Sequence, residues 1–444
     1  MKAQLLDIRD KLCQPWLMTV LLVALIPLFP EYVAPFLAGG SLVTAIVDAR
    51  LHRRELSLGL LGKLLLLYMA YMAVGILYAA KPFNSLGTVM MWLVAFLVYL
   101  AMSTVLTNRH RIDAVLFCIT VVAGLVGFIA CVQYILNAWF GIGVPFYFWN
   151  WIDEVVYRVF PMPLTLDIHE MRSASTFNNQ NVMAEYLIMM MPFVMFYTFG
   201  GNRTGTRVLR NLNRCCLLFA LGGVAFSFSR GAYLSLLLIV LIFCVANIKR
   251  RNILLIGTVA AVVLIPTSIM SRLFSVGSMD GSITERIGVW GVTLEEIIKH
   301  PVFGTGPGIQ NLWNTLSANG YSSPHAHNLV LQLLAEGGLI ALSLMVFIGW
   351  KMFRRSFKML SHSTETRTMG VVFLAFIGAF ILYGMVDFPF LCPKLMCVFM
   401  LVLGISDSVG RVYMEERVEG LSSLGYPAHT LRRTPGNAVI SKTK

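Results

Sequence analysis

Two histidines are the residues of this sequence best suited to acid–base chemistry. His325 and His327 stand in SSPHAHNLVLQLLAEGGLIAL, directly before a long apolar stretch. Desolvation lowers the pKa of a histidine, which favours a neutral imidazole able to accept a proton near pH 7. The spacing of two residues keeps the rings off a common helical face, so one general base fits better than a paired metal site. The alternative is that the histidines only pack or cap the following helix. His325 and Asn328 are the candidates for supporting residues beside His327.

Three arginines are candidates for binding an anionic group. Arg230 lies in FSFSRGAYLSL, at a tight break between two apolar runs, and Arg172 precedes the small polar stretch SASTFNNQN. Arg286 follows Glu285 in a predicted loop helix. Guanidinium groups bind phosphate through forked hydrogen bonds that lysine cannot reproduce. Three guanidinium groups at the same depth of the membrane interface would therefore match a diphosphate. The alternatives are a depth-setting arginine at position 230 and a solvated one at position 286.

Metal and other cofactors are not expected. No DxD-like acidic pair accompanies the arginines, which disfavours a metal-bridged sugar nucleotide. The arginines would then compensate the leaving-group charge themselves. The eight cysteines show neither zinc spacing nor a paired extracellular framework.

The composition indicates which elements must position these residues. The chain has 444 residues, of which 57% are hydrophobic and 13% charged, with a mean hydropathy of +0.74. Soluble domains have about 45–50% apolar and about 25% charged residues. The apolar runs are about 17–25 residues long, the length that crosses a bilayer as a helix. The net charge of +13 therefore indicates topology and not a nucleic-acid partner.

These patterns predict an all-α membrane protein of about twelve transmembrane helices, with a helical extracytoplasmic loop region between the ninth and tenth spans. The predicted spans are residues 15–29, 32–48, 58–79, 85–106, 112–138, 181–199, 213–228, 231–247, 253–270, 327–350, 368–386 and 393–409. The predicted parts are an N-terminal transmembrane bundle of about nine spans (1–270), the extracytoplasmic loop with short helices (271–326), the C-terminal transmembrane helices (327–409) and a cytoplasmic tail (410–444).

The distribution of lysine and arginine predicts the orientation. With the N-terminus in the cytoplasm, 27 of the 35 basic residues fall on the cytoplasmic side, as the positive-inside rule requires. Both termini are then cytoplasmic. The candidate histidines and arginines all fall on the extracytoplasmic side. The eight basic residues there are Lys81, Arg158, Arg172, Arg230, Arg272, Arg286, Lys299 and Lys394.

From about Arg172 to about Asp387 the chain resembles the O-antigen ligase and polymerase superfamily of polytopic bacterial envelope glycosyltransferases. The motifs that carry the resemblance follow in order: RSASTFNNQNVMAEY, SFSRGAYLSL, TERIGVWGVTLEEIIKHPVFGTGPG and HAHNLVLQLLAEGGLIAL. The ligase pattern is His, then Asn, Ser or Gln, then nine residues, then Gly-x-x-Gly. His327, Asn328 and Gly338 match it, whereas Ala341 replaces the last glycine, which weakens ligase against polymerase. The first 130 residues match only by hydropathy.

The resemblance implies metal-independent transfer of a glycan from an undecaprenyl-diphosphate carrier to lipid A–core, on the periplasmic face of the bacterial inner membrane. It implies that His327 is the general base and Arg230 a second catalytic residue. It also implies that Arg230, Arg286 and Arg172 bind the diphosphate of the donor. The expected partners are this donor, the lipid A–core or another glycan acceptor, and the bilayer.

Four alternatives remain open. A polysaccharide polymerase and a protein O-oligosaccharyltransferase share the superfamily, and motif order does not separate them. A secondary transporter of an anionic lipid or sugar would show inverted repeats and broken helices in matching halves, but no repeat is visible. A lipid flippase would place cations within the spans and not only at their outer ends.

Overall fold

The computed structural model of the protein describes residues 14–142, 148–149, 172–199, 206–246 and 281–423. Every regular element within these residues is a helix. The predicted ninth span (253–270) and most of the predicted outer segment 139–180 lie outside the described residues.

Eleven apolar helices correspond to eleven of the twelve predicted spans. Eight of them are long and apolar enough to cross a membrane by length and composition, and three are shorter. The prediction of an all-α membrane protein is thereby confirmed. The helices are α2 (Pro15–Leu25), α3 (Ala34–Leu51), α4 (Leu60–Gly75), α5 (Pro82–Val105), α6 (Arg109–Ala138), α8 (Gln180–Phe199), α9 (Arg207–Phe226), α10 (Arg230–Ala246), α15 (Leu329–Met359), α16 (Thr364–Gly384) and α17 (Pro393–Ser423).

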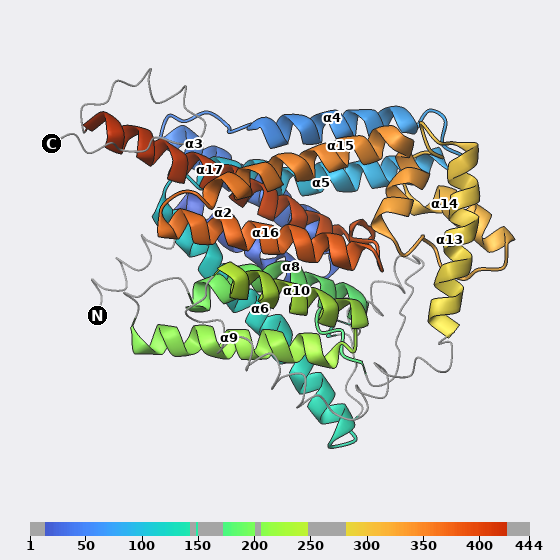
Figure 1. Cartoon of the computed structure of the whole chain (residues 1–444), viewed down its shortest axis with the longest axis horizontal. Coiled ribbons are helices and arrows are strands. Elements are labelled where there is room, and N and C mark those ends of the chain that lie inside the picture. Colours follow the sequence, from blue (N-terminus) through green and yellow to red (C-terminus); the bar gives the residue numbers. More distant parts are fainter. Residues whose placement is uncertain (1–13, 143–147, 150–171, 200–205, 247–280, 424–444) are drawn as a thin grey trace.

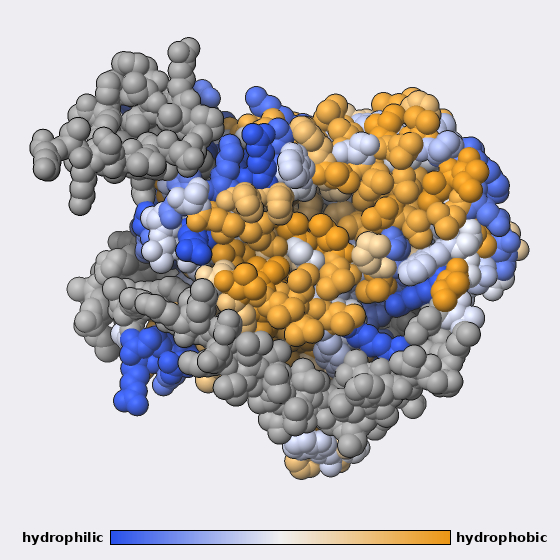
Figure 2. All heavy atoms as spheres, in the orientation of Figure 1, coloured by the Kyte–Doolittle hydropathy of each residue, from blue (hydrophilic) through white to orange (hydrophobic). Residues whose placement is uncertain are grey.

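Two further helices form the described part of the long loop, α13 (Gly281–Lys299) and α14 (Ile309–Ala318). Figure 1 shows the apolar helices running roughly parallel, with α13 lying across one end of the bundle. Figure 2 shows hydrophobic side chains over the middle of this face and hydrophilic ones towards its ends. This distribution is typical of a bundle whose middle faces lipid and whose ends face water.

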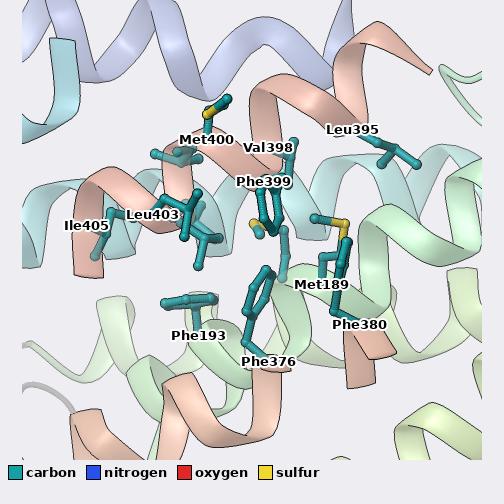
Figure 3. Packing of buried hydrophobic residues seen from close by; sticks show 14 of the residues in the cluster. Met189, Phe193, Phe376, Phe380, Leu395, Val398, Phe399, Met400, Leu403 and Ile405 are labelled. Atoms are coloured by element: carbon teal, nitrogen blue, oxygen red, sulfur yellow. The ribbon is translucent and has the colours of Figure 1, made fainter. Parts of the chain in front are cut away.

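Aromatic packing holds α8, α16 and α17 together in the core (Figure 3). The ring centroids of Phe380 on α16 and Phe399 on α17 are 5.1 Å apart. Those of Phe193 on α8 and Phe376 on α16 are 6.3 Å apart. Side-chain packing of this kind drives helix association in a membrane, where lipid is as apolar as the core. It provides the rigid frame from which the polar helix ends project.

The bundle end opposite α13 carries a buried ion pair between two helices. Asp48, near the end of α3, accepts hydrogen bonds from Arg111 near the start of α6 and from Arg54 in the following loop, both at 2.7 Å. The Asp48 side chain is fully buried and that of Arg111 is 9% exposed. These arginines are among those predicted on the cytoplasmic side.

We expect Asp48→Ala to destabilise the bundle by about 3–5 kcal/mol, because it leaves the buried Arg111 guanidinium uncompensated. Thermal unfolding of the purified protein in detergent measures this change. Arg50→Ala, which alters an exposed residue of the same helix, is the matched control and should leave the melting temperature nearly unchanged. Equal melting temperatures for both variants would contradict the prediction.

Candidate active site

The two histidines lie on a tight turn before α15, residues 323–328, which we call the histidine loop. The His325 side chain is buried, whereas His327 is partly exposed. Their ring centroids are 4.0 Å apart, and the backbone N–H of His327 donates a hydrogen bond to His325 Nδ1 at 3.1 Å. His327 has a positive φ of 46°, which is uncommon for a residue other than glycine. His325 therefore supports the backbone of His327 and does not cap the helix.

An aspartate that was not among the predicted site residues lies against His327. Asp387 follows the end of α16, and its Oδ1 is 3.3 Å from His327 Nδ1. Burial acts to raise the pKa of Asp387, but the hydrogen bond and charge interaction with His327 outweigh it and hold that pKa below its usual range. An ionised carboxylate at Nδ1 orients the imidazole and leaves Nε2 for proton transfer.

Burial controls the protonation of the second histidine. Burial lowers the pKa of His325 to about 3, and the neighbouring His327 and Arg286 act in the same direction. His325 is therefore neutral over the physiological pH range. Of the two rings, only that of His327 is partly exposed, so it is the one placed to meet a substrate.

Asn328 connects the histidine loop to two helices. Its Oδ1 accepts hydrogen bonds from the backbone N–H groups of Val330 and Leu331 at 3.0 and 3.1 Å and thereby caps α15. Its Nδ2 donates to the carbonyl oxygen of Met385 at 3.0 Å. Asn328 thus joins the start of α15 to the segment that carries Asp387.

Arg172 precedes α8 in the sequence and lies at the same end of the bundle. Its side chain contacts the break between α9 and α10. Its Nε donates to the carbonyl oxygen of Ser227 at 2.8 Å, and an Nη donates to Asn181 Oδ1 at 2.7 Å. Both bonds hold the guanidinium between α8 and the α9–α10 break.

Arg230 is the first residue of α10 and is partly exposed. The preceding Ser229 contacts the Tyr383 hydroxyl at 3.1 Å, and that hydroxyl donates to the carbonyl oxygen of Asn181 at 2.8 Å. The backbone N–H of Asp387 in turn donates to the carbonyl oxygen of Tyr383 at 3.1 Å. A continuous series of contacts therefore connects the start of α10 with the carboxylate beside His327.

Arg286 reaches the site from α13. It lies close enough to His325 to influence its pKa. One turn further along α13, Trp290 Nε1 donates to the carbonyl oxygen of Ala326 at 2.9 Å, within the histidine loop. The structure thus brings Arg286 and the two histidines together, and it places Arg172 and the start of α10 at the same bundle end.

One known protein family matches part of the chain. A family model described as O-antigen ligase matches residues 215–346. This part of the chain is similar to the O-antigen ligases. The resemblance inferred from the motifs is thereby confirmed over these residues, which include Arg230, Arg286 and His327 and exclude Arg172 and Asp387. No curated protein matches the chain.

The ligase pattern of His, Asn and Gly has a structural basis at Gly338. This residue interrupts α15 with φ 62° and ψ −161°, a conformation open essentially only to glycine. The freed backbone groups pair with residues 301–306, which lie within the matched residues 215–346. These hydrogen bonds are Thr305 N–H to Ala335 O at 2.7 Å, Gly306 N–H to Glu336 O at 3.0 Å and Leu339 N–H to Pro301 O at 2.9 Å.

The departure from the ligase pattern at Ala341 is small in structural terms. Ala341 is fully buried and lies close to Gly337, where a methyl group would come within 2.4 Å of its Cβ. One small residue facing a glycine therefore satisfies the packing at this break.

We expect Gly338→Ala to destabilise the protein. Backbone strain alone costs about 1–3 kcal/mol, and the total loss should be larger. A Cβ at this position would lie 2.2 Å from the carbonyl oxygen of Val302, so the paired segment would also be displaced. Thermal unfolding in detergent measures the loss.

Gly349→Ala is the matched control, because a Cβ added there on the same helix meets nothing within 4 Å. A Gly338→Ala protein as stable as this control would contradict the prediction.

The histidine–aspartate group also has the composition of a metal site. Among the described residues, potential ligand atoms of His325, His327 and Asp387 all lie within 4.8 Å of one another. No metal was expected from the sequence, because two histidines at this spacing are a poor pair of ligands, but Asp387 supplies a third group. The same contacts are those of a base held by a carboxylate, and chelation distinguishes the two arrangements.

Proposed function

We propose that the protein is a membrane glycosyltransferase that moves a glycan from an undecaprenyl-diphosphate carrier to an acceptor hydroxyl, acting as an O-antigen ligase on lipid A–core. The observation that carries the proposal is the His327–Asp387 pair. It lies at the same bundle end as the arginines, and His327 falls inside the segment matched to O-antigen ligases.

In this mechanism His327 removes the proton from the acceptor hydroxyl. The hydroxyl oxygen then bonds to the anomeric carbon as the bond from that carbon to the carrier phosphate oxygen breaks, which inverts the configuration. Asp387 orients the imidazole and stabilises the imidazolium that forms. The carrier diphosphate leaves with the electron pair of the broken bond, and Arg230, Arg286 and Arg172 bind its charge.

We further propose that the site faces the periplasm of the bacterial inner membrane and that both termini are cytoplasmic. The support is the separation of charge in the bundle. The arginines around Asp48 lie at the end opposite α13, whereas the candidate site lies at the α13 end. Positive charge concentrates on the cytoplasmic side of such proteins.

A polysaccharide polymerase is the second candidate, favoured by Ala341 at the last position of the ligase pattern. A protein O-oligosaccharyltransferase would use the same site. A strain lacking the gene separates the first two candidates. Loss of all glycan from lipid A–core, restored by the intact gene, supports the ligase, whereas retention of a single repeat unit supports the polymerase.

Purified protein with lipid-linked donor and acceptor tests the metal-independent mechanism. Full transfer in the presence of a chelator agrees with it. Abolition by chelator, with recovery on adding a divalent ion, would show instead that His325, His327 and Asp387 bind a catalytic metal.

A further inference from the structure

Ala326, the residue between the two histidines, is held through both of its backbone polar groups. Its N–H donates to Gln332 Oε1 at 2.9 Å, and its carbonyl oxygen accepts from Trp290 Nε1 at 2.9 Å. Ala326 is itself fully buried. The flanking rings of His325 and His327 therefore take their positions from side chains of α13 and α15.

The orientation of the Gln332 amide depends on a second side chain, one helical turn further along α15. Gln332 Nε2 donates to Glu336 Oε1 at 2.8 Å, and both side chains are buried. Because Glu336 Oε1 accepts this hydrogen bond, the amide nitrogen of Gln332 faces Glu336. The amide oxygen of Gln332 must then face the backbone N–H of Ala326.

Glu336 is anchored in turn to the loop before α14. The backbone N–H of Gly308 forms a hydrogen bond with its carboxylate. The residue also lies two positions before Gly338, the break in α15, and its carbonyl oxygen accepts from the N–H of Gly306. We call the series Gly308–Glu336–Gln332–Ala326 the glutamate relay.

We infer that Glu336 and Gln332 are positioning residues that hold the histidine loop so that His327 meets Asp387. This inference rests on the transfer reaction proposed above. His327 has a backbone conformation that persists only when the surrounding structure imposes it, and the relay fixes the residue directly before it. Gln332 and Glu336 both lie among the nine residues between Asn328 and Gly338. The ligase pattern does not specify which residue types stand at these nine positions.

Two variants test whether the hydrogen bonds of this series, and not a glutamate at position 336 as such, hold the histidine loop. Glu336→Leu removes the acceptor, so Gln332 no longer has a fixed orientation. The double variant Gln332→Glu with Glu336→Gln exchanges the two groups. In it, the carboxylate at position 332 accepts from Ala326 N–H and from the amide at position 336, whose oxygen accepts from Gly308 N–H.

Hydrogen–deuterium exchange of the peptide containing residues 323–328 measures the loop directly, in detergent and without substrate. We expect faster exchange at Ala326 in Glu336→Leu than in the wild type, and wild-type exchange in the double variant. Glu295→Leu, at an exposed acid of α13, is the control and should leave the peptide unchanged.

Transfer kinetics measure the consequence. We expect Glu336→Leu to lower kcat about 10²-fold with little change in the KM for donor, because a misplaced catalytic group costs about this much. The double variant should recover most of that loss.

Unchanged exchange in Glu336→Leu would overturn the relay. Faster exchange with an unchanged kcat would overturn its role in transfer while leaving the proposed function intact. A wild-type protein that transfers no glycan would overturn the proposed function, and the exchange measurement would still decide whether the relay holds the loop.

Discussion

Replacing His327 with alanine is expected to slow glycan transfer about 10²–10⁴-fold, the usual contribution of a general base. The expectation rests on the partly exposed imidazole, whose Nδ1 is held by Asp387 at 3.3 Å. Binding of the lipid-linked donor should change little, because the diphosphate is assigned to the arginines. Purified variants in detergent, assayed for product and separately for donor binding, measure both quantities.

His325→Ala is the comparison within the same loop and should cost less, because His325 supports the backbone of its neighbour and is buried. A His327→Ala protein with the full rate would rule out the mechanism proposed here.

The pH profile of transfer gives an independent measure of the same base. The rate should fall towards acid pH, because a protonated imidazole cannot accept a proton. The pKa of His325 is lowered to about 3 and that of Asp387 lies below its usual range, so neither group titrates between about pH 5 and 8. Asp387→Asn should lower the rate, because it removes the carboxylate that orients the imidazole and stabilises the imidazolium formed during transfer. If the fall in rate at acid pH persists in His327→Ala, a group other than His327 causes it.

Replacing Arg230 with lysine is expected to impair transfer nearly as much as Arg230→Ala, by about 10²–10³-fold, comparable to the loss of one preorganised donor at a developing charge. Lysine keeps the charge but loses the two parallel donors that match a phosphate. The start of α10 is fixed by the contact of Ser229 with Tyr383, so a shorter point charge has little freedom to adapt. Rates with saturating acceptor and varied donor, in purified variants, measure the effect.

Arg367→Lys is the matched control, an exposed arginine in the first turn of α16 that lies away from the proposed site. Normal transfer by the Arg230→Lys variant would show that Arg230 sets helix depth and does not bind the diphosphate.

Most of the fold could be predicted from the sequence, because the length of an apolar run reports directly on membrane crossing. The ends of the helices were less predictable. The span expected at 58–79 is a helix only from Leu60 to Gly75, since a turn follows and the chain then contacts the long loop through Tyr78 and Phe303. That contact joins residues 225 positions apart, and no local pattern reveals it.

The candidate site was predictable only in part, for the same reason. The His-Asn pair and the arginine at a tight break could be recognised locally from residue type and neighbours. Asp387 could not, because its partner His327 lies 60 residues earlier and the two meet only through the packing of α15 and α16. Its position at a predicted span end was the available signal, since an acid placed there either faces water or has a partner.

The break in α15 has a consequence for exchanging parts between related enzymes. Residues 301–306 and 335–339 share a ladder of backbone hydrogen bonds and approach too closely for a side chain at Gly338. A chimaera that takes the long loop from a homologue but keeps its own α15 would combine two segments that were not selected to pack on each other. The exchangeable block is therefore the loop together with α15, through and beyond its break.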